Sequence, residues 1–398
     1  MKRYYAVLLR LYPTKKQQKF IDKTINDCRF LYNQMLNERK QVYERFKGDK
    51  KILYGWKYKT EKQYKEEFEF LKEDDSYALQ QTKRHIENAY TNFFKSLSGV
   101  RKGGRINFPV FKKKKKTKSG KYTTYNNMNC IRFVDQKHIQ LPKIKKVRIN
   151  FDEKTNNNKD KIIFVTVIKS TTGKYFCSVL FNKIVDEKVE MQLTEKSKVI
   201  GLDMSLTNFF VDSNGKSPVY KKIYKKHEKR LKSLQHLESR KKKGSRRQKK
   251  LRKSINLLNE KISNKRKDFS HKLSTSLVQN NDIIVTETLD LKTMSQTMKL
   301  GKSVMDLGYS MFINQLQYKC EWYGKCLLKA DKWFASSKIC HHCGYKYDDL
   351  TLVERKWVCP NCGNEINRDE NAAINLQNLG IAHIHKCLQS QDISSAVK

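Results

Sequence analysis

The chain has 398 residues, which is long enough for about two to four domains and a sizeable core. Its 84 Lys and Arg residues against 40 Asp and Glu residues give a formal net charge of +44, which predicts a polyanionic partner, nucleic acid first and a membrane surface second. No run of about 18 apolar residues occurs, which excludes a transmembrane helix. The first residues show no apolar signal-peptide core, so we expect an intracellular protein of the cytoplasm or nucleoid that is not secreted.

The N-terminal part combines one strand with helices. Residues 4–11 alternate as a strand does, and Thr14 and Gln17 then have the spacing of a capping box that begins a helix. A second helical stretch is predicted over about residues 60–97. These helices fit a plain bundle or, because their polar faces carry many lysines, a surface that contacts DNA, and the sequence leaves both interpretations open.

Short alternating segments follow between about residues 100 and 198. They lie at 131–134, 139–141, 147–151, 162–168 and 175–181, and the turn residues Thr171, Thr172 and Gly173 between the last two are typical of a hairpin. We interpret these segments as a small antiparallel β-barrel whose first strand is residues 4–11, so that the helices split the barrel. The lysine run at 112–116 is explained equally by a solvated loop or by a nucleic-acid contact through Lys112, Lys113 and Lys114.

The apolar run at 199–203 predicts a buried strand that ends in Asp203, and residues 208–212 continue as a hairpin that turns at 213–215. From about 221 to 280 the chain is helical and very basic. Its apolar seam breaks at Gly244 and Ser245, which predicts two antiparallel helices joined there. The charge density favours a nucleic-acid contact, and an exposed hairpin with no partner is the alternative. The candidate contacts on this hairpin are Arg240, Arg246, Arg247 and Arg252.

A second buried strand is predicted over residues 282–287 and ends in Glu287. A helix over about 310–324 and a strand over 326–330 precede a cysteine-rich segment. A helix over 372–379, which follows Asp369, closes the fold. The tail from about residue 386 is polar, and we expect it to be frayed.

Two CxxC pairs predict a structural zinc site. Cys340 and Cys343 form the first pair, and Cys359 and Cys362 form the second after fifteen intervening residues, which is the spacing of a zinc ribbon. A glycine after each pair permits a tight turn. Four thiolates leave no open position on the metal, so we expect one structural Zn²⁺ without a catalytic role, and neither of the two histidines in the first pair should bind it.

Asp203, Glu287 and Asp369 are the candidate catalytic residues. Hydrolysis of a phosphodiester by two metal ions needs carboxylates that hold the cations about 3.5–4 Å apart, and Mg²⁺ or Mn²⁺ prefers such oxygen ligands. An RNase H-like fold supplies these carboxylates from a central strand, a neighbouring strand and a helix. Taken singly, each acid is explained as well by a cap or a turn. Their order, their predicted elements and the interposed zinc ribbon all agree with a nuclease site.

These motifs resemble those of the TnpB family, transposon-encoded RNA-guided DNA nucleases related to type V CRISPR effectors and to the eukaryotic Fanzor proteins. Residues 199–209 resemble the first RuvC motif of the family, 283–289 the second and 367–376 the third. The segments 11–14, 29–33, 92–94 and 108–112 resemble its N-terminal motifs, so the resemblance covers essentially the whole chain. Ser205, Thr288 and Asn367 depart from the pattern. None of them is a proposed metal ligand, and whether they reduce activity stays open.

The resemblance implies a multidomain chain of α/β and α+β parts. A RuvC-like nuclease domain with an RNase H-like fold (198–335 and 364–385) would contain an inserted zinc ribbon that binds target nucleic acid (336–363). A small β-barrel wedge domain (1–12 and 99–197) would precede it, split by a helical recognition domain (13–98). Residues 386–398 would form a flexible tail.

The resemblance also implies the activity and the partners. The protein would be a monomer that binds a long guide RNA from the transposon end. It would recognise a short motif beside double-stranded target DNA and cut guide-matched DNA with two Mg²⁺ or Mn²⁺ ions. One alternative is an RNA-guided DNA-binding regulator without cleavage, which cutting that depends on Asp203 would exclude. The other is a DNA transposase or its accessory protein, although no signature of the single-strand transposases stands out.

Overall fold

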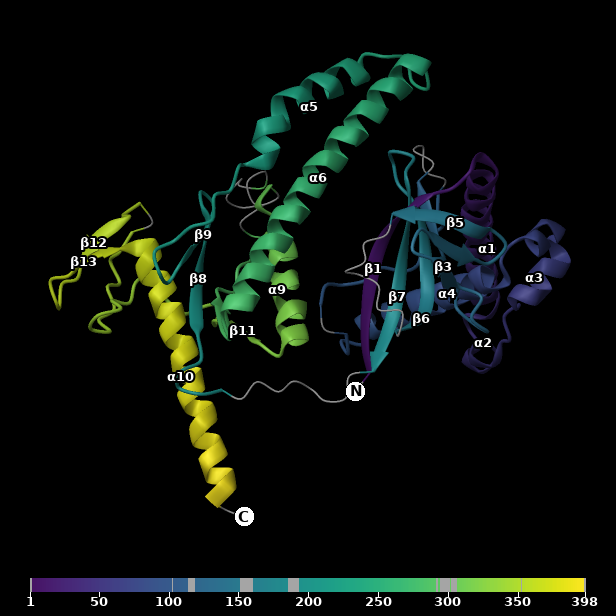
Figure 1. The fold of residues 1–398 in the computed structure, drawn as a ribbon. Coiled ribbons are helices and arrows are strands. Elements are labelled where there is room, and N and C mark those ends of the chain that lie inside the picture. Colours follow the sequence, from purple (N-terminus) through teal and green to yellow (C-terminus); the bar gives the residue numbers. More distant parts are fainter. Residues whose placement is uncertain are drawn as a thin grey trace. The chain divides into compact units, whose positions relative to one another are not determined.

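A computed structural model describes residues 2–101, 103–113, 119–150, 160–184, 193–290, 293, 301, 306–351 and 353–396. The chain divides into two units, Met1–Glu187 and Lys188–Lys398, and each is described by itself (Figure 1). Of the helices within these described ranges, none combines the length and the apolar composition that crossing a bilayer requires.

The first unit contains a seven-stranded sheet in which every pair of neighbours is antiparallel. Its order is β2-β6-β7-β1-β5-β4-β3, and the strand expected at residues 4–11 is the central β1. The strands are β1 (Lys2–Tyr12), β2 (Gly120–Tyr125), β3 (Arg132–Asp135), β4 (His138–Leu141), β5 (Lys145–Asn150), β6 (Lys161–Lys169) and β7 (Tyr175–Ile184). The expected hairpin turn joins β6 to β7, where Ser170 and Lys174 pair and Gly173 has a φ of +83°.

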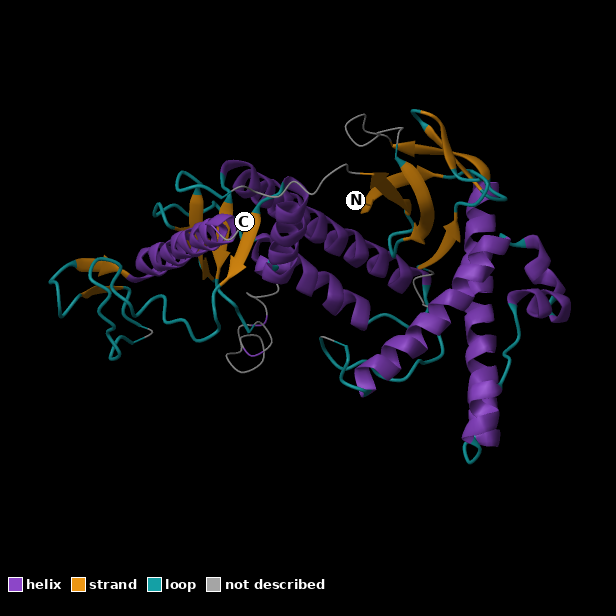
Figure 2. Ribbon diagram, turned by 90° about the horizontal axis from the view of Figure 1, so that it is seen from below, coloured by secondary structure: helices purple, strands orange, loops and turns teal. Residues whose placement is uncertain are grey.

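The sheet curls but its hydrogen bonds do not close it into a barrel (Figure 2). The rings of Phe133 on β3 and Phe181 on β7 stack with centroids 6.3 Å apart although three strands lie between them. The end strands β2 and β3 are nevertheless not paired within the described residues. A closed barrel requires both end strands to meet in register, and β3 is only four residues long and irregular at Phe133–Asp135. The predicted barrel is therefore an open, curled sheet in the described residues.

The helices of the first unit are α1 (Lys15–Phe46), α2 (Lys50–Gly55), α3 (Glu61–Glu67), the 3-10 helix η1 (Glu69–Glu73) and α4 (Ser76–Leu97). The capping box predicted at Thr14 and Gln17 begins α1. The single helix expected over 60–97 is wrong in detail, because α3 ends before Phe68, a 3-10 helix follows, and the chain is extended at Asp74 and Asp75. The Asp75 carboxylate accepts from the backbone N–H of Tyr77 and so starts a separate helix.

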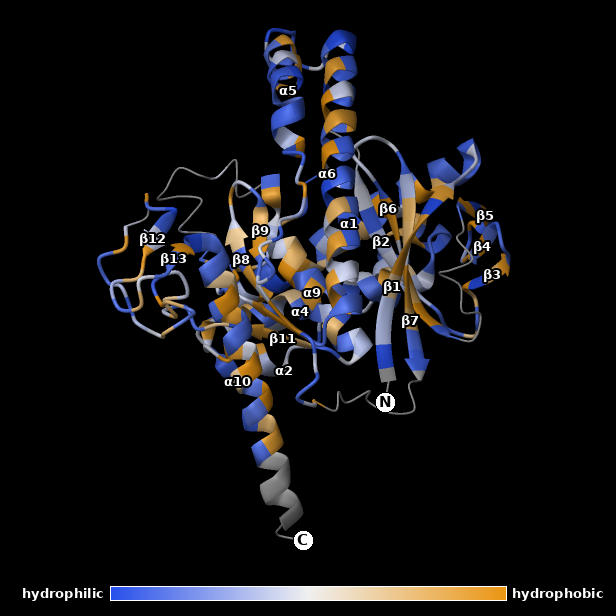
Figure 3. Cartoon of the chain, turned by 60° about the vertical axis from the view of Figure 1, so that its left-hand side comes forward, coloured by the Kyte–Doolittle hydropathy of each residue, from blue (hydrophilic) through white to orange (hydrophobic). Residues whose placement is uncertain are grey.

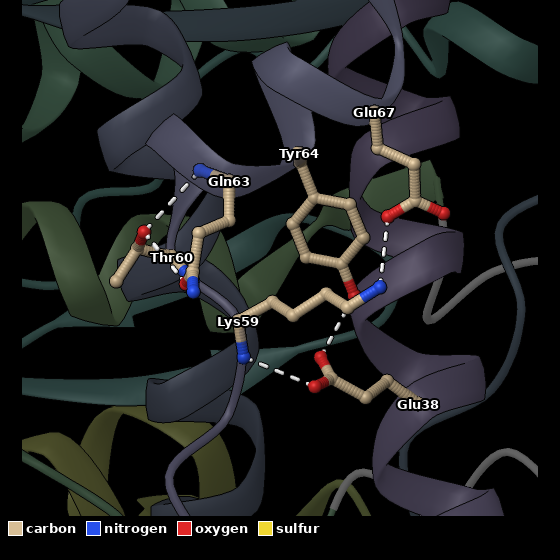
Figure 4. Close-up of polar contacts among 6 residues, drawn as sticks. All are labelled: Glu38, Lys59, Thr60, Gln63, Tyr64 and Glu67. Carbon is tan, nitrogen blue, oxygen red and sulfur yellow. Dashed lines mark hydrogen bonds and ion pairs between the residues drawn. The ribbon is translucent and has the colours of Figure 1, made fainter.

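Polar contacts hold the start of α3 against α1 (Figure 4). Thr60 and Gln63 form a second capping box. The Glu38 carboxylate on α1 accepts from the backbone N–H of Lys59 at 3.0 Å and from the hydroxyl of Tyr64 at 2.8 Å. Thr60 and Gln63 thus satisfy N–H groups at the start of α3, and Glu38 anchors the residue before it to α1.

The second unit is built on a four-stranded mixed sheet with the order β11-β10-β8-β9. Its strands are β8 (Val199–Ser205), β9 (Phe209–Asp212), β10 (Ile283–Thr286) and β11 (Cys326–Lys329). β10 is parallel to both β8 and β11, whereas β9 is antiparallel to β8. The hairpin predicted to turn at residues 213–215 turns instead at 206–208, between β8 and β9. Ser213, Asn214 and Gly215 form the next turn, after β9, where Asp212 and Lys216 pair.

Helices cover both faces of this sheet (Figure 1). Ile200, Leu202 and Ile284 pack with residues of α6 (Arg246–Asn280) and α9 (Tyr309–Tyr323). Val199, Ile283 and Val285, which alternate with them, pack with residues of α10 (Arg368–Ala396). The alternation of a strand buried on both sides therefore gives a three-layer α/β arrangement.

Two further features complete the second unit. α5 (Ile223–Ser239) and α6 form the predicted helical hairpin, joined at Gly244 and Ser245, and hydrophilic residues dominate α5 (Figure 3). A small ribbon with β12 (Lys356–Val358) paired to β13 (Glu365–Asn367) lies between β11 and α10 in the chain. The frayed tail predicted from residue 386 is wrong up to Ala396, because α10 continues to that residue. No Gly or Pro follows Gly380 to stop the helix.

Candidate active site

Two of the three candidate acids lie side by side on neighbouring parallel strands. Residues 283–286 of β10 pair in register with 199–202 of β8, so one further step along both strands brings Glu287 beside Asp203. Strands are about 4.8 Å apart and alternate their side chains between two faces, which places both carboxyl groups on the face that α10 covers. The two carboxyl groups lie close enough for each to influence the pKa of the other.

The third acid comes from the first turn of α10, which approaches β8 unusually closely. A Cβ on Gly201 would lie 2.0 Å from the carbonyl oxygen of Ala373, and a Cβ on Gly380 would lie 2.5 Å from Cγ1 of Val199. Only glycine permits this approach. The helix that carries Asp369 is therefore held against the strand that carries Asp203.

The negative charges of the three acids lie close together and affect the ionisation of Asp203 and Glu287. Burial raises the pKa of Asp203 to about 9, and the negative charges of Glu287 and Asp369 add to this rise. Burial also raises the pKa of Glu287, partly offset by hydrogen bonds from Ser336 and Asp203. The cause in both cases is that a carboxylate removed from water next to other carboxylates loses its solvation and is repelled by them.

Three neighbours of the acids could not be identified from the sequence. The Ser336 hydroxyl donates to Glu287 Oε1 at 3.0 Å, and Arg355 Nη1 lies 3.2 Å from Asp369 Oδ1. The buried Tyr309 hydroxyl donates to the backbone carbonyl oxygen of Ser205, at the end of β8. Arg355 lies on the exposed loop between the cysteine pairs, where no sequence pattern marks it. Ser336 lies in the segment between β11 and the first cysteine pair, which no predicted motif includes.

The donor set of this centre fits Mg²⁺ or Mn²⁺. All three groups are carboxylates, the hard oxygen ligands that these cations prefer. Burial, followed by the charges of Glu287 and Asp369, keeps the pKa of Asp203 raised although the charge of Arg368 lowers it. A divalent cation would supply positive charge there and would favour the ionised forms of Asp203 and Glu287.

The four predicted zinc ligands lie together in the ribbon. Sγ of Cys340 is 3.7 Å from Sγ of Cys362, Sγ of Cys343 is 3.6 Å from Sγ of Cys359, and all four atoms lie within 4.8 Å of one another. Zn–S bonds of about 2.3 Å in a tetrahedron separate the sulfurs by about 3.8 Å. The cluster therefore has the size and the ligand type of a closed structural Zn²⁺ site.

The residues that depart from the family pattern have local structural contacts. The Thr288 hydroxyl donates to the carbonyl oxygen of Ala330 at 2.6 Å, directly after Glu287. The Asn367 side chain accepts from the backbone N–H of Asp369 at 3.2 Å and so caps the start of α10. The Ser205 hydroxyl bonds that of Thr207 within the β8–β9 turn.

The predicted nucleic-acid contacts fall into different environments. Arg240, Arg246 and Arg247 are exposed around the tip of the α5–α6 hairpin, in a stretch (240–253) that contains ten Lys and Arg residues and no acid. Arg252 pairs with Glu238 on α5 and so ties the two helices together. The Lys112 ammonium lies 3.6 Å from the ring centroid of Tyr32. Lys113 is exposed, and Lys114 lies outside the described residues.

Three family models match consecutive parts of the chain. Residues 1–48 match a model described as "Helix-turn-helix domain", residues 183–298 one described as "Probable transposase", and residues 309–376 one described as "Cas12f1-like, TNB domain". The last of these contains all four cysteines and Asp369.

Curated relatives align with nearly the whole chain. A Streptomyces pristinaespiralis protein named "Putative RNA-guided DNA endonuclease" is 30% identical over 95% of this chain and 89% of its own length. A protein of the same description from Escherichia coli K12 is 27% identical over 96% of this chain and 94% of its own length. Among solved structures, a Cas12f1–sgRNA–target DNA complex shares the fold with a TM-score of 0.60 at 13% identity, covering 94% of this chain and 99% of that one.

Proposed function

Because the chain belongs to the TnpB family, we propose that it is an RNA-guided DNA endonuclease that cuts DNA with a RuvC-like, metal-dependent site. The observation that carries this proposal is the placement of Glu287 in register beside Asp203, with Asp369 on the helix packed against them. The relatives' names and the shared fold support the activity, and the acidic centre supports its chemistry.

The chain's own residues have distinct roles in this proposal. Asp203, Glu287 and Asp369 hold the divalent cations, which would supply the positive charge that phosphodiester hydrolysis needs at the attacking and leaving oxygens. The strand register fixes the first two carboxylates relative to each other, and the α10 contact positions the third. Cys340, Cys343, Cys359 and Cys362 hold one Zn²⁺ that stabilises the ribbon and takes no part in the reaction.

The partners in this proposal are a guide RNA and double-stranded DNA. The net charge of +44 supports a polyanionic partner, and the exposed arginines at the tip of the α5–α6 hairpin suit contacts to phosphates. Base pairing with the guide would read the target sequence, while the protein would hold the duplex by its backbone and read only a short flanking motif.

A cleavage assay with acid variants tests the proposal. Asp203→Ala, Glu287→Ala and Asp369→Ala should each reduce guide-matched cleavage in Mg²⁺ below detection, because each removes a cation ligand. Binding of RNA and of target DNA should remain, measured by gel shift. Glu321→Ala, which removes an exposed acid on α9, is the matched control and should cut as the unmodified protein does.

Other outcomes point elsewhere. If any one of the three acid variants cleaved DNA at the rate of the unmodified protein, that acid would not be a cation ligand. RNA and target binding without cutting by the unmodified protein would indicate an RNA-guided regulator. Failure to bind RNA at all would favour the transposase alternative.

A further inference from the structure

Glu287 is held by a serine that lies outside the three acids. The Ser336 side chain is buried, with 4% of its surface exposed, and its single hydroxyl hydrogen is donated to Glu287 Oε1 at 3.0 Å. Because a hydroxyl has only one hydrogen to donate, this bond fixes one oxygen of the carboxylate. Glu287 has three side-chain torsions, so its orientation in the free protein depends on such a partner.

Ser336 is in turn fixed by α10. Nδ2 of Asn375 donates to the backbone carbonyl oxygens of Ser336 at 2.8 Å and of Ile339 at 2.6 Å. Asn371, one helical turn earlier and fully buried, donates to the carbonyl oxygen of Ile339 at 2.7 Å and accepts from the backbone N–H of His341 at 2.9 Å. These bonds clamp the segment that leads into the first cysteine pair onto the helix that also carries Asp369.

We propose that Ser336 is a positioning residue for Glu287, and that Asn375 holds Ser336 in place, so that the segment entering the zinc ribbon sets the divalent-cation affinity of the acidic centre. The inference rests on the proposed function, in which the three acids bind the cations. Residues that hydrogen-bond to a metal ligand orient it, and their removal typically costs about 10- to 100-fold in metal affinity. Ser336 has the same relation to Glu287.

The neighbouring serine supplies a matched control. Ser337 is the next residue along the chain, and its hydroxyl makes no hydrogen bond to any residue that the structure describes. A purely local disturbance of this segment by substitution should therefore appear equally in Ser336→Ala and Ser337→Ala. A positioning role should appear only in the former, and Ser336→Thr, which keeps the hydroxyl, should restore binding.

The test is Mn²⁺ binding by the zinc-loaded, full-length protein, followed through the electron paramagnetic resonance signal of free Mn²⁺. Asp203→Ala defines the signal that does not come from the acidic centre. We expect Ser336→Ala to raise the Mn²⁺ dissociation constant of that centre about 10- to 100-fold, with zinc content and thermal midpoint retained, and Ser337→Ala to bind as the unmodified protein does. Asn375→Ala should weaken binding in the same direction, with little further loss when it is combined with Ser336→Ala, because both act through one contact.

The outcomes separate the two proposals. If the unmodified protein and Asp203→Ala bind Mn²⁺ alike, the cation centre itself is wrong. If Asp203→Ala loses binding but Ser336→Ala matches the unmodified protein, the centre stands and the positioning role is overturned. Equal losses in Ser336→Ala and Ser337→Ala, or no rescue by Ser336→Thr, would also overturn it. If the losses of Mn²⁺ affinity in Asn375→Ala and Ser336→Ala were additive, Asn375 would not act through Ser336.

Discussion

Asp203 and Glu287 are a costly pair to bury in the metal-free protein. Two adjacent carboxyl groups cannot both ionise there without repulsion and loss of solvation, so the folded protein retains a proton that the unfolded chain releases. Ionising both carboxyl groups in the folded protein therefore has an electrostatic cost, which a bound cation would reduce. This gives the acids an effect on stability that can be measured without any nucleic acid.

The direction of that effect follows from the raised pKa. The pKa of Asp203 lies at about 9 in the folded protein against an ordinary value of 3.8. The electrostatic cost of burying the pair is therefore absent at low pH and grows as the pH rises between those two values, which lowers the stability of the folded protein. In buffer free of divalent cations, the thermal midpoint of the unmodified protein should fall between about pH 5 and about pH 8 by more than that of Asp203→Asn, which cannot ionise. Thermal denaturation of both proteins at both values measures the difference.

Mg²⁺ supplies the control for this measurement. Mg²⁺ should raise the thermal midpoint of the unmodified protein at about pH 8, because the proton that competes with it for the acid pair is then held only weakly. It should change the midpoint of Asp203→Asn much less. If the thermal midpoints of the two proteins changed alike with pH, with and without Mg²⁺, the raised pKa would not belong to Asp203.

At the level of the elements, the contact between α10 and β8 is the feature on which the site depends most. Gly201 on the strand and Gly380 on the helix let the two backbones approach. The neighbour of Gly201 is a backbone oxygen, which no rotamer change can move, whereas the neighbours of Gly380 are the side chains of Val199 and Val285. The two glycines should therefore respond differently to the same substitution.

Gly201→Ala should destabilise the protein by about 1–3 kcal/mol or more, the range for overpacking a well-packed core, because α10 must move away from β8. Gly380→Ala should cost less, since alanine inside a helix recovers about 1 kcal/mol of helix propensity. Urea denaturation gives both values. Gly55→Ala, where an added Cβ meets nothing within 4 Å, is the control, and an unchanged midpoint for Gly201→Ala would contradict the close contact.

The elements also show where sequence patterns succeed and fail. The capping box at Thr14, the strands that contain or precede the acids and the helical hairpin follow from local periodicity and capping, so they could be predicted. The strand β2 could not, because Gly120–Tyr125 follows a lysine run that is typical of a loop. The break at Asp74 and Asp75 could not either, because both acids fit an exposed helix, although they are buried. The tertiary contact that buries them leaves no local pattern.

At the level of the whole molecule, the charge of +44 makes binding to nucleic acid depend on salt. Removing one side chain that neutralises a phosphate lowers the slope of log affinity against log salt by about 0.7 to 0.9. Arg246→Ala combined with Arg247→Ala should therefore lower the slope for the guide RNA by about 1.4 to 1.8 if both side chains contact phosphates. Filter binding at several salt concentrations measures this slope.

Arg252→Ala is the control within the same hairpin. Its guanidinium pairs with Glu238, so the substitution should lower the stability of the hairpin and leave the salt slope nearly unchanged. An unchanged slope in the Arg246 and Arg247 double variant would support an exposed hairpin without a nucleic-acid partner.

The candidate site could be predicted in its members but not in its geometry. The order of the three acids along the chain and the cysteine spacing identify them, since both are properties of the sequence. The register that sets Glu287 beside Asp203 is a relation between strands separated by two long helices, and no local pattern reports it. The roles of Ser336, Asn371 and Asn375 could not be predicted for the same reason. The hydrogen-bond partners of their side chains are at least 30 residues away in the sequence and come close only in the fold.

The close packing of α10 on β8 also bears on when the proposed nuclease site can form during synthesis of the chain. During synthesis the ribosome releases β8 and β10 long before it reaches Arg368, so a nascent or prematurely terminated chain holds two acids but neither the helix that carries the third nor the asparagines that clamp the ribbon. Such a fragment cannot assemble the cutting centre. The order of the segments along the chain thus means that the proposed site can form only after α10 has been synthesised.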